Sequence, residues 1–443
     1  MRIRMRTAVM LATAGLLTAA CGGGSDTPEK ASTPNSGGDS GQTISTDISA
    51  ELTYWDTSNA DTEVPVFKQL VAKFNETYPN VKIDYQVVPF EDAQNKFLAA
   101  AQAGKGMPDV LRSEVAWTSQ FAARGYLLDL SDSPLADDMS DYLDTPMSSN
   151  MYKGKMYGVP QVTDTLALYY NKKLFAKAGI DKPPTSWDEV ESDAKLLKTK
   201  AGVDGIALNP QGYFLLPFIY GAGGDMVDTD SKTIELTSNA DVQGISTAAQ
   251  LIKDGAAPKP PATDGYAAAM DAFLGNQVGM VLNGPWEIGN ISGNAKFGGI
   301  DNLGIAPVPA GTDQAGAPVG GHNYVITSAV TDPDKQLAAA AFISFMNSTT
   351  SQAFLADKLG LLPTRRSAYD EPAVKDNAVI SAFEPALEIA HPRPWIPEGG
   401  QFFAPLDTMA VSVLVQGTDP AVALKTAAQT YKDEIVPSYS LGD

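Results

Sequence analysis

The stretch Gly154–Asn171 constrains the fold more than any other part of the chain. Pro160 removes a backbone donor and restricts the residue before it, so a strand that enters at Tyr157 is expected to break or turn there. The alternation in Thr165–Tyr170 predicts a second strand, with Asp164 between the two. The pattern predicts a crossover between two lobes with a carboxylate in the cleft, or alternatively a surface hairpin whose aspartate caps a turn.

The length of the chain predicts more than one domain. With 443 residues it exceeds the size at which a single hydrophobic core keeps growing, and a hydrophobic content of 44% excludes a largely disordered chain. Strands are predicted at Glu51–Asp56, Val81–Val88 and after Asp109, and helices at Val64–Tyr78 and Glu91–Ala103. Alternation of strands and helices predicts parallel βα units and therefore an α/β fold.

The same alternation continues beyond the crossover. We expect helices at Asn171–Ala178, Trp187–Lys200, Asp334–Met346 and Thr350–Leu359, strands at Gly205–Leu208, Val278–Leu282, Leu303–Ala310 and Asn323–Thr327, and an aromatic-rich segment at Gln211–Tyr220. A helix opens at Asn283–Pro285, directly after a strand, where ligands of open α/β sheets usually bind. The Gly-rich segment before Asn323 is expected to be a connector that returns across the hinge.

The N-terminal segment predicts export. Met1–Ala20 carries three arginines followed by an apolar run too short to span a bilayer, which is typical of a signal peptide. Cys21 follows it directly, is the only cysteine, and resembles the lipidated cysteine of a bacterial lipobox; the alternative is a buried or accidental thiol. Residues 21–48 are rich in Gly, Ser, Thr, Pro and acids, which indicates a disordered tether. We expect a lipoprotein anchored on the extracytoplasmic side of the membrane.

Composition excludes several classes of function. A formal net charge of −20 argues against nucleic acid and anionic lipid as ligands. Two histidines and one cysteine leave nothing for a zinc site or a Cys-His pair. The acids Asp225, Asp228 and Asp230 lack the glycine and the distal glutamate of an EF-hand loop, so a hairpin is predicted there instead of calcium. We expect no metal and no cofactor.

Aromatic residues next to polar or acidic ones recur at predicted loops. Such places are Trp55-Asp56, Glu114 with Trp117, Asp164, Tyr213-Phe214, Trp286-Glu287, Trp395 and Phe402-Phe403. A pyranose has an apolar C–H face and a ring of hydroxyl groups, so its receptor needs flat aromatic surfaces and acceptors for hydroxyl donors. The pattern favours a sugar-binding site; the alternative is that these aromatic residues belong to the core.

Several motifs resemble, in order and spacing, the maltose/maltodextrin-binding proteins of ABC importers, especially the lipid-anchored actinobacterial forms. They are WDTSNAD, DVLRSEVAWTSQFAARGYLLDL, KMYGVPQVTDTLALYYNKKLFAKAGI, LNGPWEIGNI, GGHNYVI, LLPTRRSAY and FFAPLDTMAVSVLVQG, within Leu52–Val436. The resemblance implies a two-lobe periplasmic-binding-protein-like α/β fold with discontinuous lobes and a hinge. We place the lobes at residues 49–163 with 311–370 and at 164–310 with 371–443.

The resemblance also implies roles for single residues. Asp164 falls where the family has an acid that takes sugar hydroxyls, and three aromatic platforms fall on Tyr213, Trp286 and Phe403, the last a tryptophan in better-known members. Glu114 and Trp117 lie in a loop that departs from the enterobacterial pattern, and His322 lies in GGHN. The predicted ligand-binding residues are Asp56, Asn59, Glu114, Trp117, Asp164, Tyr213, Trp286, Glu287, His322, Trp395 and Phe403.

The resemblance implies a monomeric, non-enzymatic protein that captures an oligosaccharide and delivers it to a membrane permease. Alternatives are another disaccharide such as trehalose, a surface lipoprotein that binds a protein or peptide, and a glycoside hydrolase that uses two of Asp164, Glu114 and Glu287. Connections at Gln161–Thr165, Ala310–Pro318 and Tyr369–Asp376 are expected to absorb a closing rotation. Without ligand, the Asp164 carboxylate is expected to face water, because no Lys or Arg is adjacent in sequence.

Overall fold

Two β-sheets dominate the part of the chain that the computed structural model describes, residues 44–442. The predicted signal peptide, Cys21 and most of the tether lie outside these residues. The described residues belong to a single compact unit. In residues 44–442 we find no helix of the length and apolar character that a membrane crossing requires.

The larger sheet has the strand order β14-β13-β3-β1-β2, and β6 is also paired with β13. Its strands are β1 (Ala50–Asp56), β2 (Val81–Val87), β3 (Val110–Glu114), β6 (Val159–Thr165), β13 (Ala317–Ile326) and β14 (Ala390–His391). β1 runs parallel to β2 and β3, whereas β13 is antiparallel to β3 and β6. The three strands that the sequence predicted in the first part of the chain are therefore confirmed.

Helices accompany this sheet, four of them at places that the sequence predicted. They are α1 (Val64–Thr77), α2 (Phe90–Gln102), α3 (Val115–Ala123), α4 (Asp144–Ser148), α11 (Pro333–Met346), α12 (Thr349–Leu359) and α13 (Pro372–Lys375). α1 buries Val64, Phe67, Leu70 and Phe74, which recur at helical spacing along one face. It ends ahead of Pro79, because the residue before a proline avoids the helical conformation.

The smaller sheet has the order β12-β7-β11-β8. Its strands are β7 (Ala167–Asn171), β8 (Asp204–Ala207), β11 (Val278–Asn283) and β12 (Leu303–Ala306). β7 is antiparallel to β11 and β12, and β8 is parallel to β11. Every residue of β11 is buried, as its nearly continuous apolar sequence predicts for a strand covered on both faces.

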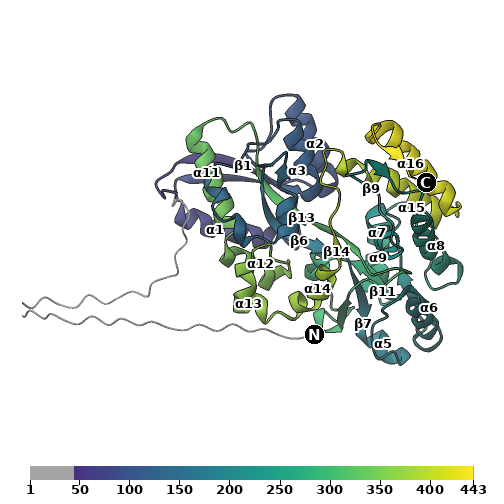
Figure 1. Ribbon diagram of the computed structural model, residues 1–443. Coiled ribbons are helices and arrows are strands. Elements are labelled where there is room, and N and C mark those ends of the chain that lie inside the picture. The colour runs from purple at the N-terminus through teal and green to yellow at the C-terminus, as the bar shows by residue number, and fades with distance from the viewer. Residues whose placement is uncertain (1–43, 443) are drawn as a thin grey trace, which may run out of the picture. The chain divides into compact units, whose positions relative to one another are not determined.

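The remaining helices surround the smaller sheet or extend from it. They are α5 (Lys172–Ala178), α6 (Trp187–Leu196), α7 (Gly212–Gly221), α8 (Asn239–Lys253), α9 (Gly265–Leu274), α10 (Ile288–Gly293), α14 (Ala378–Glu388), α15 (Phe403–Leu414) and α16 (Pro420–Thr430). α15 packs against α7 and α16, and α16 packs against α8, at the C-terminal end of the chain (Figure 1). The aromatic-rich Gln211–Tyr220 segment is thus the helix α7.

Two neighbouring strands, β6 and β13, link a hydrophobic core beside the larger sheet to one beside the smaller sheet (Figure 1). Val162 of β6 packs in the core beside the larger sheet, and Leu166, just beyond β6, packs in the core beside the smaller one. In β13, Tyr324 packs in the core beside the larger sheet and Ala317 packs in the core beside the smaller one. The predicted crossover at this place is confirmed, while the lobe boundaries given above stay a prediction.

The effect predicted for Pro160 is confirmed in part: a bulge re-aims the strand here, although β6 is not broken at the proline. β6 continues through the proline, and the register on β13 shifts between His322 and Asn323, which pair with Val162 and Pro160. Gln161 is therefore an extra residue, a β-bulge, and bulges are one of the few places in a sheet that tolerate proline. Asp164 lies inside β6 and not between two strands.

The second half of the Gly-rich segment before Asn323 is strand and not loop, because β13 begins at Ala317, while residues 311–316 form the connection that leads into it. Two other short strand pairs complete the fold: β4 (Met151–Tyr152) with β5 (Lys155–Met156), and β9 (Val227–Asp228) with β10 (Thr233–Ile234), which also pairs with β15 (Ser440–Leu441). The β9–β10 pair confirms the hairpin predicted for the acidic segment around Asp228.

Candidate functional site

A buried carboxylate, Asp164, lies where β6 passes Gly320 of β13. The two residues are paired in the strand register, and Asp164 is only 8% exposed. An added Cβ on Gly320 would lie 2.0 Å from Asp164 Oδ1 and 2.8 Å from the Tyr213 hydroxyl. Gly320 therefore makes the room in which both side chains lie. Asp164 is largely buried, but its oxygen atoms are not among the fully buried ones without a partner, so the expectation that the carboxylate faces water in the free protein stays a prediction.

Among the cations near Asp164, Arg393 stabilises the ionised carboxylate the most. It follows β14, which runs parallel to the start of β13, and only 6% of it is exposed. Its Nε donates a hydrogen bond to the carbonyl of Val319 at 2.8 Å, and its Nη2 forms an ion pair with Glu114. The other oxygen of Glu114 accepts the backbone N–H of Ala116 at 2.8 Å and so caps α3.

Three aromatic rings surround the Arg393 guanidinium. Its carbon lies 5.3 Å from the ring centre of Phe403 and 5.7 Å from those of Tyr213 and Trp395. These distances are within the range of cation–π contacts. α7 supplies Tyr213 and the start of α15 supplies Phe403, so two helices beside the smaller sheet contact an arginine that follows a strand of the larger one.

The charges of this cluster shift each other's ionisation. Burial raises the pKa of Asp164 to about 7; Arg393 opposes the rise and Glu114 adds to it. Burial would lower the pKa of Arg393, but Glu114, Tyr213 and Asp164 outweigh this and hold the pKa above its usual range. Asp164 accepts no hydrogen bond from the residues that the structure describes, so its oxygen atoms remain available to hydroxyl donors.

Trp286 and Glu287 follow β11 and are held by Tyr266 of α9. The Tyr266 hydroxyl accepts a hydrogen bond from Trp286 Nε1 at 2.8 Å and donates one to Glu287. The Trp286 ring lies over Gly284, where an added Cβ would be 2.0 Å from the ring. Aromatic contacts continue from Tyr266 through Phe214 to Tyr213, each at 5.7 Å between ring centres. Trp286 is thus joined to Tyr213 of the cluster through Tyr266 and Phe214.

Two of the predicted ligand-binding residues, Asp56 and Asn59, form hydrogen bonds within the protein. The carboxylate of Asp56 is fully buried and accepts hydrogen bonds from Ser58 and Tyr85. Asn59 is exposed, and its side chain accepts the backbone N–H groups of Asp61 and Thr62 just before α1. These contacts account for both residues within the fold, and their part in ligand binding stays a prediction.

Trp117 and His322 lie beside the cluster on the side of the larger sheet. His322 pairs with Glu114 across β13 and β3. Trp117, on α3, is 6% exposed and stacks on Phe90 at 5.3 Å between ring centres. The structure therefore brings Glu114, Asp164, Tyr213, Trp395 and Phe403 together around Arg393 and places Trp117 and His322 next to them.

Reasoning from the sequence missed Arg393. Its partner Glu114 is 279 positions away, so no local pattern joins the two. The available signal was its place between two prolines in HPRPW, two residues before the predicted Trp395. Gly320 was also missed, because a glycine in a strand carries no chemistry of its own.

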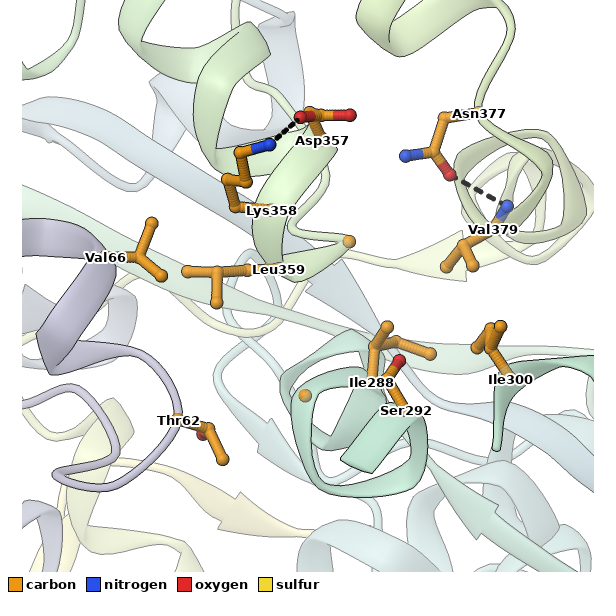
Figure 2. A pocket seen from close by; sticks show the side chains of 12 residues that line it. Thr62, Val66, Ile288, Ser292, Ile300, Asp357, Lys358, Leu359, Asn377 and Val379 are labelled. Atoms are coloured by element: carbon orange, nitrogen blue, oxygen red, sulfur yellow. Dashed lines mark hydrogen bonds and ion pairs between the residues drawn. The ribbon is translucent and has the colours of Figure 1, made fainter. Parts of the chain in front are cut away.

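A separate groove of about 400 Å³ lies between α1 and α10, with the end of α12 along one side (Figure 2). Its lining comprises Thr62, Val66, Ile288, Gly289, Ser292, Ile300, Asp357, Lys358, Leu359, Gly360, Asn377 and Val379. No lining residue is aromatic, and none is a predicted sugar contact. We therefore assign the candidate site to the Asp164–Arg393 cluster and not to this groove.

Two of the three acids considered for hydrolysis have partners within the fold. In residues 44–442 no group of three or more His, Cys, Asp or Glu side chains is placed to hold a metal ion. Glycoside hydrolysis uses a pair of carboxyl groups that flank one bond. Here Glu114 is bound to Arg393 and Glu287 to Tyr266, so Asp164 is the one of these three acids without a hydrogen-bond partner in the described chain.

The fold has two α/β cores joined by the paired strands β6 and β13. A carboxylate, an arginine and aromatic rings lie beside these strands, as expected of a receptor for a polar solute. The chain belongs to the family of bacterial extracellular solute-binding proteins, whose model matches residues 60–353. The resemblance stated from the sequence and the two-lobe α/β fold are thereby confirmed.

Individual relatives span most of the chain. One is the GacH receptor of Streptomyces glaucescens GLA.O, which has crystal structures in the unliganded form and in complex with acarbose. It is 39% identical in sequence, the alignment covers 89% of this chain and 100% of the receptor chain, and the TM-score is 0.85. Maltose-bound MalE3 of T. maritima is 25% identical over 86% of this chain and 99% of its own, with a TM-score of 0.77. The maltotriose-binding protein of Pyrococcus abyssi is 28% identical over 84% of this chain and 79% of its own.

Proposed function

We propose that this protein binds a maltodextrin-type oligosaccharide at the Asp164–Arg393 cluster and delivers it to the permease of an ABC importer. One observation carries the proposal: a buried carboxylate that lacks a hydrogen-bond partner in the described chain lies beside an arginine ringed by three aromatic side chains. Such a group is costly to bury unless donors satisfy it, and sugar hydroxyls are suitable donors. The aromatic rings suit the C–H faces of pyranose rings.

The relatives support this class of ligand. Acarbose, maltose and maltotriose are named for three proteins that each align with more than four fifths of this chain. The alternative of a glycoside hydrolase is disfavoured, because two of its three candidate acids are already engaged by Arg393 and Tyr266. The family to which the chain belongs is described as solute-binding proteins, which also favours binding over hydrolysis.

The lobes proposed at residues 49–163 with 311–370 and 164–310 with 371–443 would close on the ligand. β6 and β13 support such a hinge, because each runs from one core to the other. The third connection is supported by Leu361 and Leu362, neighbours that belong to different cores and lie a few residues before the expected Tyr369–Asp376. The free energy of closure is limited by the contacts that the ligand gains only in the closed form.

Calorimetric titration of the mature protein with maltose, maltotriose, maltotetraose and acarbose tests the ligand class, with trehalose and cellotriose as controls. We expect binding of the α-1,4-linked sugars in the micromolar range or tighter, a smaller radius of gyration by X-ray scattering at saturation, and no release of glucose from maltotriose. Preference for trehalose would replace maltodextrin as the ligand. Failure of every sugar to bind would contradict the proposed function, and glucose release would favour the hydrolase.

The anchor is a further part of the proposal. We propose that Cys21 carries a diacyl modification, since one acyl chain alone gives only marginal membrane binding. Replacing Cys21 with serine is expected to move the protein from the membrane fraction into the medium of cells that export it. Immunoblots of both fractions would measure this change. Retention of the Cys21→Ser variant in the membrane fraction would show that another segment holds the protein there.

A further inference from the structure

Phe90 presents an exposed aromatic ring beside the cluster. It is the first residue of α2 and is 44% exposed, which is high for a phenylalanine. Its ring stacks on Trp117 with an interplanar angle of 24° and meets His322 edge-on at 5.9 Å. Gly400 also approaches this stack, so that an added Cβ would be 3.4 Å from Cδ1 of the Trp117 ring. Trp117 is therefore enclosed, and Phe90 is the ring of this stack that faces solvent.

Two polar side chains next to this stack have nitrogen atoms without a hydrogen-bond partner in the described chain. Both ring nitrogens of His322 and the indole Nε1 of Trp395 are buried without a hydrogen bond. An unsatisfied buried polar group destabilises the fold, so several close together call for an explanation. Burial, followed by Arg112 and Arg393, lowers the pKa of His322, which makes its imidazole neutral, with one donor and one acceptor.

These groups are continuous with the Asp164–Arg393 cluster. His322 is paired in register with Glu114, which binds Arg393. Trp395 lies 5.7 Å from the Arg393 guanidinium, and its carbonyl accepts a hydrogen bond from Ser119 of α3 at 3.1 Å. α3 also carries Trp117. A ligand bound at Asp164 would therefore meet this second group of side chains if it extended along β13 toward α2.

We propose that Phe90, with Trp117, His322 and Trp395, forms an outer subsite for an additional hexose ring, and that Phe90 sets the preference for longer oligosaccharides. The inference rests on the proposed sugar-binding function and adds to it a residue that selects ligand length. The ring of Phe90 supplies the flat apolar face, while His322 and Trp395 supply hydrogen bonds to hydroxyl groups. A disaccharide that fills the inner cluster would not reach Phe90.

The test compares Phe90→Ala with the parent protein in calorimetric titrations with maltose and maltotetraose. If the ring covers about 60 Å² of sugar C–H surface, its loss is expected to weaken maltotetraose binding about ten-fold. Maltose binding is expected to change less than two-fold. Phe90→Trp keeps a flat ring and should retain most of the affinity for maltotetraose. Leu337→Ala, which removes a 40%-exposed apolar side chain from α11, is the control and should alter neither titration.

Two outcomes would overturn the outer subsite while leaving the proposed function intact. One is an unchanged affinity of Phe90→Ala for both sugars. The other is an equal loss for maltose and maltotetraose, which would place Phe90 in the common site or in the support of the fold. If the parent protein binds none of the sugars, the proposed function fails, and the outer subsite fails with it. Thermal melting of each variant shows whether the fold is preserved.

Discussion

Replacing Arg393 with alanine is expected to lower the free energy of unfolding by about 3–5 kcal/mol and to abolish measurable sugar binding. The variant would leave Glu114 buried without its ion pair and remove the centre around which Tyr213, Trp395 and Phe403 are arranged. Urea unfolding and calorimetric titration measure the two effects separately. Arg393→Lys should recover only part of each, since an ammonium group cannot bond the Val319 carbonyl and Glu114 in the same planar geometry.

A matched control separates this buried pair from ordinary surface ion pairs. Arg366 contacts Asp144 at 3.0 Å, but both side chains are largely exposed. Arg366→Ala is expected to change the free energy of unfolding by less than about 1 kcal/mol and to leave sugar affinity unchanged. The double variant Arg393→Ala with Glu114→Gln should be more stable than Arg393→Ala alone, because it no longer buries an unpaired charge. Equal stability of the two would argue that Glu114 is neutral or solvated without Arg393.

Replacing Asp164 with asparagine is expected to weaken sugar binding about 10- to 150-fold, the effect of losing one hydrogen bond to a charged group. The same substitution should stabilise the free protein near pH 8. The Asp164 carboxyl has a folded-state pKa of about 7, raised by burial from 3.8, so its favourable contribution is complete below about pH 4 and is lost as the pH rises to 7. This loss is on the order of 4 kcal/mol in the parent and absent in Asp164→Asn.

The measurement is urea unfolding of both proteins from pH 4 to pH 8 in the absence of sugar. The stability difference between Asp164→Asn and the parent should grow through this interval and level off above pH 7. Taking a difference cancels other buried acids, such as Asp241, whose pKa burial raises to about 8. A difference that does not vary with pH would mean that Asp164 is solvated in the free protein. An unchanged sugar affinity would place the ligand elsewhere.

The sequence predicts the regular elements of this fold better than its site. The apolar stripe of α1 and the proline after it define the helix almost to the residue, because both signals are local. The first half of β13 was missed, because Gly320 and Gly321 have low β-propensity and their positions are decided by contacts with Asp164, Tyr213 and Val162. Tertiary contacts of this kind are not visible in a single sequence.

For the site, the resemblance identified Asp164, Tyr213 and Phe403, and the structure brings them together. It could not give the partner of Glu114, since Arg393 is 279 positions away and only the folded chain brings the two together. Nor could it tell which acids form hydrogen bonds within the protein. Asp56 and Glu287 were predicted as ligand-binding residues, and in the folded chain each accepts a hydrogen bond from a tyrosine hydroxyl.

Gly320 gives the site a vulnerability that a search for functional side chains would overlook. Every glycine codon is one base away from an alanine codon, and the added methyl carbon would overlap Asp164 Oδ1 at 2.0 Å. That single nucleotide change would leave the acid, the arginine and the aromatic rings in the sequence while filling the space they share. In natural variants of this gene, loss of sugar binding would then trace to a position that contributes no side chain to recognition.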